Sequence, residues 1–367
     1  MTTITGGRLA TGARHELYMT DGLLVAEDHS GARVDYDGLI VSPGFIDLQI
    51  NGAFGHDFTQ DPETIWEVGR RLPELGVTAF TPTIVTSPDE VTDLAIEVVT
   101  NRRPADYRGA HVLGLHFEGP WISPDMGGAH NPEHITEVDP ETARRWASSG
   151  VVRVVTLAPE RSGATEVGRL LSGCGVVVSL GHTAADFATA SDALSTYASM
   201  VTHLFNQMTP LGHREPGVVG AALTGARHCL LIVDGSHVAD ATLDIAWRVL
   251  GPERVILVTD AIAALGLGSG TYQLGDGPIT VGTDGPRTSD GRLAGSVVSI
   301  PEAMVRLTAT TSASVSEAIN CTTINPAIAL GLSDRGTLAV GRRADIVILD
   351  EDLGVVATYI GGEQVHG

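Results

Sequence analysis

The sequence predicts an α/β protein: a (β/α)8 TIM-like barrel with a small β-sandwich domain formed by both chain termini. Two observations carry this prediction. Eight apolar segments of strand length alternate with helical stretches through the middle of the chain, whereas both ends show only short alternating runs between Gly and Asp turns. Serial βα units of this kind are typical of a parallel barrel. The length of 367 residues suits one large domain and a modest second one.

The predicted elements follow one another in a regular order. The eight strands lie within residues 38–50, 77–85, 110–119, 151–160, 175–183, 199–206, 229–238 and 254–262. Helices follow most of them, as in residues 62–76 and 87–101, and the Gly-, Asp- and Thr-rich residues 271–296 indicate a hairpin after the eighth strand. We therefore assign residues 1–40 and 335–367 to the small β domain and residues 41–334 to the barrel.

Composition narrows the class of protein. The net charge of −21 argues against a nucleic-acid partner, which requires a basic surface, and against binding to an anionic membrane. The first 19 residues contain no long apolar run, so neither a signal peptide nor a membrane span is predicted there. Cys174, Cys229 and Cys321 are odd in number and widely spaced, which predicts reduced, buried thiols in a cytoplasmic protein.

Polar side chains gather where the predicted strands end. Any one strand-end histidine is more often structural than a metal ligand. In a parallel barrel, however, all of these side chains meet at one rim. Two histidines and a glutamate suffice for a catalytic zinc site with open positions, and a separate aspartate then resembles a general base. The residues concerned are His116, Glu118, His182, His203, Asn206, Asp234, His237 and Asp260.

Several motifs resemble those of a known superfamily. The segments "PGFID", "HFEGPW", "GAHNPEH", "GHT", "THLFN", "DGSHV", "TDA" and "GRRADIVILD" occur in this order along nearly the whole chain. They resemble the amidohydrolase superfamily, and within it the N-acetylglucosamine-6-phosphate deacetylases. The pair "HFEGP" and "GAHNPEH" is the more specific signal, since "GRRADIVILD" marks only the small β domain of the superfamily.

The resemblance implies an activity and a set of roles. The reaction would be metal-dependent hydrolysis of the acetamide of N-acetylglucosamine 6-phosphate to glucosamine 6-phosphate and acetate, in amino-sugar catabolism or cell-wall recycling. Glu118, His182 and His203 would hold one divalent metal per chain, with zinc favoured and iron, manganese or cobalt as alternatives. Asp260 would be the catalytic acid/base, and His130 would polarise the acetamide carbonyl. A homodimer is also implied.

Recognition of the phosphosugar is assigned in the same way. Arg214 lies in the Gly- and Pro-bounded segment "LGHREPG", and its planar guanidinium suits phosphate oxygens. The alternative is a surface arginine in a solvated turn. The substrate-binding residues implied by the resemblance are Ala129, His130, Asn206, Gln207, Arg214, His237, Leu293, Ala294 and Gly295.

One segment departs from the pattern of many amidohydrolases. These place a His-x-His at the end of the first strand for a second metal, whereas Gln49 and Asn51 stand there in this sequence. A neutral amide oxygen is a poor zinc ligand beside imidazole or carboxylate, so the second site is predicted to be empty. The amides would fill its space with hydrogen bonds.

Three other functions compete with this interpretation. N-acetylgalactosamine 6-phosphate differs from the proposed substrate at one hydroxyl, which the sequence does not discriminate. A cyclic amidase commonly needs a carboxylated lysine, and the chain contains no lysine. A non-catalytic phosphosugar sensor would keep Arg214 and His237 but would not need Asp260.

Overall fold

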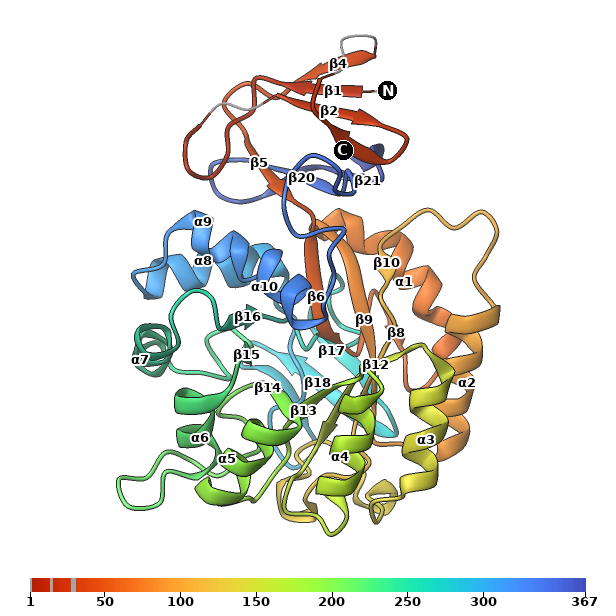
Figure 1. Ribbon diagram of the computed structural model, residues 1–367, viewed down its shortest axis with the longest axis vertical. Coiled ribbons are helices and arrows are strands. Elements are labelled where there is room, and N and C mark those ends of the chain that lie inside the picture. Colours follow the sequence, from red (N-terminus) through yellow and green to blue (C-terminus); the bar gives the residue numbers. More distant parts are fainter. Residues whose placement is uncertain (1, 14–15, 28–30) are drawn as a thin grey trace.

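The structure is a computed structural model that describes residues 2–13, 16–27 and 31–367. Residues 1, 14–15 and 28–30 fall inside the predicted N-terminal part of the small domain and lie outside the described residues. The chain forms a barrel domain with a smaller β domain beside it, and both ends of the chain lie in the smaller domain (Figure 1). The predicted fold class is confirmed.

Eight strands form the barrel, and each overlaps a segment predicted from the sequence. Seven of them pair in parallel with their neighbours in the order β9, β11, β12, β13, β14, β15 and β16, and β6 pairs in parallel with β9. The ring closes where Ile50 bridges Ala261 beyond β16. The bounds are β6 Phe45–Ile50, β9 Val77–Val85, β11 Leu115–Glu118, β12 Val152–Leu157, β13 Val177–Leu180, β14 Ala198–Val201, β15 His228–Leu231 and β16 Val255–Leu257.

Helices surround the strands, as the labels in Figure 1 show. Their buried apolar faces share one hydrophobic core with the strands. The predicted helical stretch 62–76 is made of η1 Pro62–Thr64, α1 Ile65–Arg71 and η2 Leu72–Leu75, and the stretch 87–101 is α2 Asp89–Asn101. The other helices are α3 Pro140–Ser149, α4 Ala164–Gly173, α5 Phe187–Thr196, α6 Gly217–Gly225, α7 Asp240–Leu250, α8 Ile300–Thr310, α9 Val315–Asn320 and α10 Ile324–Ala329, with short η3 Pro124–Met126 and η4 Pro132–His134.

The small domain is a sandwich of two four-stranded sheets that share an apolar core. One sheet has the order β3 Leu23–Val25, β2 Leu17–Thr20, β1 Thr2–Thr5 and β4 Ala32–Asp35. The other has the order β22 Glu363–His366, β21 Val355–Ile360, β20 Ile346–Leu349 and β5 Ile40–Pro43. Because β5 pairs with β20, the small domain extends to Pro43, three residues beyond the boundary assigned from the sequence.

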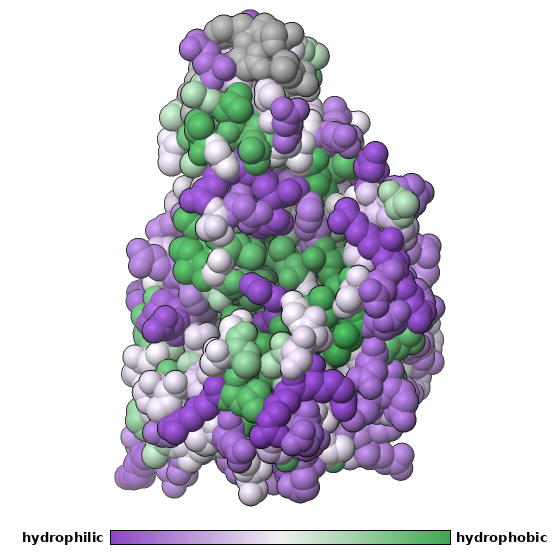
Figure 2. Space-filling model, turned by 45° about the vertical axis from the view of Figure 1, so that its right-hand side comes forward, coloured by the Kyte–Doolittle hydropathy of each residue, from purple (hydrophilic) through white to green (hydrophobic). Residues whose placement is uncertain are grey.

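The segment after the eighth strand forms the expected hairpin, extended by a third strand. β17 Gly270–Leu274, β18 Gly277–Gly282 and β19 Gly285–Thr288 make an antiparallel sheet. Three short strands remain. They are β7 Gly52–Ala53, which pairs with β8 His56–Asp57, and β10 His111–Val112. On the face in Figure 2, apolar side chains gather in the middle of the barrel domain and hydrophilic ones surround them. Within the described ranges, no helix combines the length and apolarity of a membrane span.

Candidate metal centre and active site

The strand ends bring four of the predicted residues together. Glu118 is the last residue of β11, His182 and His203 each stand two residues beyond their strands β13 and β14, and Asp260 follows β16. All four side chains are buried and line the same pocket. Because parallel strands present their carboxyl ends at one rim, residues up to 142 positions apart in sequence (118 to 260) meet here.

Three side-chain atoms form a close triangle at this rim. Glu118 Oε1 lies 3.2 Å from His182 Nε2 and 3.0 Å from His203 Nε2, and the two imidazole nitrogens are 3.0 Å apart. In a tetrahedral zinc site with bonds of about 2.0–2.1 Å, neighbouring ligand atoms stand about 3.3 Å apart. The triangle therefore has nearly the size that one divalent metal requires.

A hydrogen bond to the backbone shows which ring nitrogen of His182 carries the proton. Its Nδ1 lies 2.8 Å from the carbonyl oxygen of Met126, and a carbonyl can only accept, so Nδ1 carries the proton. Nε2 then presents a lone pair to the Glu118 carboxylate, which is the tautomer of a metal-bound histidine. Although burial opposes it, the hydrogen bond to Glu118 raises the pKa of His203, so the triangle favours positive charge. These residues fit a divalent metal.

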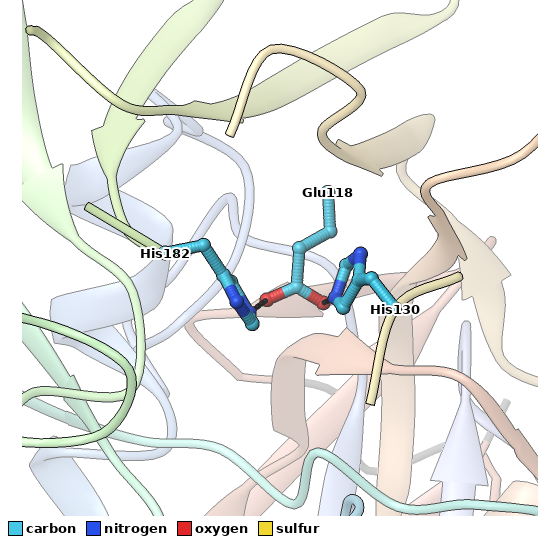
Figure 3. Close-up of side chains that lie close together, drawn as sticks. All are labelled: Glu118, His130 and His182. Carbon is cyan, nitrogen blue, oxygen red and sulfur yellow. Dashed lines mark hydrogen bonds and ion pairs between the residues drawn. The ribbon is translucent and has the colours of Figure 1, made fainter. Parts of the chain in front are cut away.

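His130 lies beside the triangle rather than in it. Figure 3 shows the Glu118 carboxylate between the rings of His182 and His130, and one atom from each of the three lies within 4.8 Å of the others. His130 Nε2 is 3.9 Å from Glu118 Oε2, which is farther than His203 Nε2 lies from Oε1. The shorter contacts favour His203 as the third ligand and leave His130 free to meet a bound molecule.

The surroundings of His130 suit a neutral hydrogen-bond donor. Its Nδ1 lies 2.8 Å from Thr86 Oγ1 and 3.3 Å from the backbone nitrogen of Thr86, so Thr86 fixes the ring by this edge and leaves Nε2 towards Glu118. Burial lowers the pKa of His130 to about 3, and the nearby His182 adds to this effect. The ring is therefore neutral near pH 7, with its Nε2 edge beside Glu118 and the pocket.

Asp260 is held by the two amides that replace the His-x-His of many amidohydrolases. Gln49 Nε2 donates to Asp260 Oδ1 and to Glu118 Oε1, both over 3.1 Å, and Asn51 Nδ2 donates to Asp260 Oδ1 over 2.8 Å. The amides thus fill this space with hydrogen bonds, as the sequence suggested. Burial raises the pKa of Asp260 to about 6, and the charge of Glu118 adds to the rise. A carboxyl group with its pKa raised in this way is suited to proton transfer near neutral pH.

The backbone is strained at the residues that carry the chemistry. His182, His203 and Asp260 have φ values of 47°, 27° and 47°, and neighbouring Gln207 has 50°. Such values are uncommon outside glycine and cost about 1–3 kcal/mol each when the surrounding structure imposes them. Strain that recurs at three converging side chains is typical of a functional site, where it serves to aim them.

The pocket is lined by nearly all the residues predicted to bind substrate. His237 is oriented by Asp234, whose Oδ2 accepts from His237 Nδ1 over 2.8 Å. Gly295 has a φ of 60°, and a Cβ there would stand 2.8 Å from the carbonyl oxygen of Asp260, so only glycine fits. The predicted residues in the lining are Glu118, Ala129, His130, His182, His203, Asn206, Gln207, His237, Asp260, Leu293, Ala294 and Gly295.

Of the predicted substrate-binding residues, all of which the structure describes, Arg214 lies outside this pocket. It is exposed and lines a neighbouring hollow between the loops that precede α5 and α6. Within one chain, the described structure therefore does not bring its guanidinium into the metal pocket.

Other residues differ from, or add to, what the sequence suggested. His116 is fully buried, with Nε2 2.8 Å from Thr156 Oγ1, and so has a structural place below the rim. Cys174 is exposed, which corrects the expectation of three buried thiols, because it stands at the solvent end of α4. Sequence reasoning missed Thr86 and Met126, which orient the two histidines. Met126 acts through its backbone carbonyl, and Thr86 acts through its backbone nitrogen and its hydroxyl.

Comparison with known proteins places these features in a family. The Amidohydrolase family model matches residues 40–365. N-acetylglucosamine-6-phosphate deacetylase of Bos taurus is 42% identical over 347 residues, covering 90% of this chain and 84% of that protein. N-acetylgalactosamine-6-phosphate deacetylase of Escherichia coli O157:H7 is 36% identical, covering 95% of this chain and 94% of that protein.

A solved structure agrees with the sequence comparison. A mutant N-acetyl-D-glucosamine-6-phosphate deacetylase from Mycobacterium smegmatis, in complex with N-acetyl-D-glucosamine-6-phosphate, superposes with a TM-score of 0.90 at 33% identity, covering 100% of this chain and 99% of that chain. Fold, motif order and identity over most of the length all agree. The chain belongs to the amidohydrolase family, in its group of N-acetylglucosamine-6-phosphate deacetylases.

Proposed function

We propose that this protein hydrolyses the acetamide of N-acetylglucosamine 6-phosphate to glucosamine 6-phosphate and acetate, using one divalent metal at Glu118, His182 and His203. The observation that carries the proposal is the ligand-sized triangle of these three side chains in the same pocket as Asp260. The 42% identical deacetylase of Bos taurus supports the choice of reaction. A sensor would have no need of a buried, strained Asp260 beside such a triangle.

The residues of the pocket divide the reaction between them. A divalent metal held by Glu118, His182 and His203, with zinc favoured, would supply Lewis acidity that lowers the pKa of water from about 16 towards about 7. Asp260 takes the proton of the attacking water at Oδ2 and returns it to the departing nitrogen, which leaves as an amine. His130 donates its Nε2–H to the acetamide oxygen, where negative charge develops.

The remaining pocket residues are proposed to hold the phosphosugar. His237, fixed by Asp234, and the amides of Asn206 and Gln207 face the same space. Ala129 and the segment Leu293–Gly295 border it from two different loops.

An acetate-release assay tests the proposal. Wild-type protein is given N-acetylglucosamine and N-acetylgalactosamine, each with and without a 6-phosphate. The highest kcat/KM on N-acetylglucosamine 6-phosphate supports the proposal. The galacto sugar is the alternative substrate, because the 36% identical Escherichia coli relative is an N-acetylgalactosamine-6-phosphate deacetylase. Absence of acetate release from all four sugars would overturn the proposed reaction.

The pH dependence follows from the environment of Asp260. Burial raises its pKa to about 6. Because the base acts in its ionised form, a raised pKa moves the acid limb of the profile upward from the range of an ordinary aspartate near 4. We expect kcat/KM to be half-maximal near pH 6 and to fall about tenfold per pH unit below it. A profile that stays flat down to pH 5 would contradict this assignment.

The proposal also gives Arg214 a contact with the phosphate and makes the protein a homodimer. Arg214 lies outside the metal pocket of its own chain, so we propose that it meets the phosphate either after movement of its loop or from a second copy. Free cysteines in the described chain support a cytoplasmic location for such an assembly.

Replacing Arg214 tests its contact with phosphate. We expect Arg214→Ala to raise KM for the phosphorylated sugar about 10- to 100-fold and to leave the unphosphorylated sugar unaffected, since a charge-assisted hydrogen bond contributes about 1.5–3 kcal/mol. Equal changes for both sugars would assign Arg214 a structural role.

Mixed subunits show which chain supplies the arginine. Arg214→Ala subunits are reassembled with inactive Asp260→Asn subunits. Recovery of wild-type KM in the mixture indicates that Arg214 acts across a dimer interface, and its absence indicates action within one chain.

A further inference from the structure

The inward face of β6 carries polar side chains that the proposed reaction does not use directly. Asp47 and Gln49 lie on this strand and Asn51 follows it, and at most 2% of each residue is exposed. Side chains two residues apart on a strand share a face, so all three point into the barrel. Buried polar groups at the mouth of a barrel require a partner, and here the partners belong to the segment that carries Asp260.

The two amides contact one oxygen of Asp260. Gln49 Nε2 and Asn51 Nδ2 both donate to Asp260 Oδ1, over 3.1 and 2.8 Å. Gln49 Nε2 also donates to Glu118 Oε1, so its two hydrogens bridge two carboxylates. Both neighbours of this amide are acceptors, which leaves only the N–H₂ end able to face them.

The backbone on both sides of these contacts is fixed as well. The N–H of Asp260 donates to the carbonyl of Gln49 and the N–H of Asn51 donates to the carbonyl of Ala261, both over 2.8 Å. Asp47 accepts the hydroxyl of Thr259 over 2.6 Å and the backbone N–H of Gln49 over 3.2 Å. The β6 strand and residues 259–261 are therefore clamped together on either side of the carboxylate.

The oxygen ends of the two amides are less well placed than their N–H ends. Gln49 Oε1 and Asn51 Oδ1 are buried and have no hydrogen-bond partner among the residues that the structure describes. Each amide thus leaves one polar atom unsatisfied while placing its N–H on the same carboxylate oxygen. The N–H ends of both amides are therefore committed to the carboxylates of the site.

We propose that Gln49 and Asn51 are positioning residues for the general base: they hold Asp260 by Oδ1 and leave Oδ2 as the oxygen that exchanges protons with the reactants. The proposal rests on the proposed deacetylation, in which Asp260 is the base. The geometry supports it because Asp260 lines the pocket and, within the described part of the chain, its side-chain hydrogen bonds all end on Oδ1. Rotation of the carboxylate would break both contacts.

The test removes the amides while keeping their volume. Asn51→Leu and Gln49→Met are compared with Asn325→Leu, a matched control in which another buried amide loses two hydrogen bonds, to the carbonyls of Pro252 and Val255 away from the pocket. We expect the two site variants to lower kcat about 10- to 100-fold, since misplacement by about 1 Å can have such an effect. KM should stay within about threefold, with one metal equivalent retained. The control should lower the melting temperature but leave kcat unchanged.

A double variant separates positioning from general loosening of the site. In the Asp260→Asn background there is no base to position, so we expect Asn51→Leu to change the residual rate by less than about twofold. A crystal structure of Asn51→Leu should also show the Asp260 carboxylate rotated or in two conformers. If the leucine variant does not fold, Asn51→Ala carries the same comparison without added bulk.

Three outcomes overturn the inference. The first is an unchanged kcat in both site variants. The second is that Asn51→Leu lowers the rate by the same factor in the Asp260→Asn background as in the wild type. The third is that the site variants lose the bound metal together with their activity. The wild-type acetate assay is run first, so that failure of the proposed function is recognised separately. An active wild type with unaffected site variants rejects the positioning role alone.

Discussion

The Asp260→Asn variant is expected to lose about two to four orders of magnitude in turnover number, the usual contribution of a positioned acid or base. Asparagine has nearly the same shape and still accepts hydrogen bonds from Gln49 and Asn51 through its carbonyl oxygen. It cannot take a proton from the attacking water. The metal content and KM should therefore remain close to wild-type values, which separates a lost base from a damaged site.

Steady-state kinetics on N-acetylglucosamine 6-phosphate, with metal analysis of the same preparation, checks this result. Asp234→Asn is a suitable companion variant, because it changes another carboxylate of the rim that supports His237 rather than the reaction. We expect its effect to fall mainly on KM. Near-wild-type turnover in Asp260→Asn would show that another group accepts the proton.

The second large effect is expected from Glu118→Ala, which removes the corner shared by both imidazoles of the triangle. Glu118 Oε1 lies within 3.2 Å of both His182 Nε2 and His203 Nε2. Although burial opposes it, the two histidines hold the pKa of Glu118 well below its usual range, so the carboxylate is charged and ready to bind a cation. Without it, we expect metal affinity to fall more than about 100-fold and acetate release to become undetectable.

Elemental analysis after dialysis against metal-free buffer measures the effect directly. We expect about one equivalent of divalent metal in the wild type, almost none in Glu118→Ala, and about one in Gln49→Ala. The last variant is the matched control, because the Gln49 amide faces the same carboxylate through its N–H₂ group and offers it no lone pair. Two tightly held equivalents in the wild type would refute the single-metal assignment and would point to His56 or Asp57 as a further ligand.

Much of the fold and the site follows from local sequence. All eight predicted strand segments overlap a barrel strand, because strand length, apolar content and turn residues are local properties. Glu118, His182, His203 and Asp260 lie together as predicted, because chemistry at the carboxyl end of a parallel strand must face one rim. The absence of lysine excludes a carbamate ligand without any coordinates.

Other features depend on contacts between distant parts of the chain. The Gln49–Asp260 bridge joins residues 211 positions apart, and no pattern around either residue indicates which oxygen receives the amide. The Met126 carbonyl that fixes the His182 tautomer is a backbone group, which any residue would supply. The left-handed backbone at His182, His203 and Asp260 runs against local preference, so only the surrounding packing imposes it.

Sequence by itself therefore determined which residues are available for chemistry and at which end of the barrel they stand. Tertiary structure alone decided how they are aimed: which histidine completes the triangle, which oxygen of Asp260 stays free, and that Arg214 lies outside the pocket of its own chain. The physical reason is that strand periodicity is set by neighbouring residues. Tautomers, rotamers and strained torsions are instead set by hydrogen bonds and packing that form only when the barrel closes.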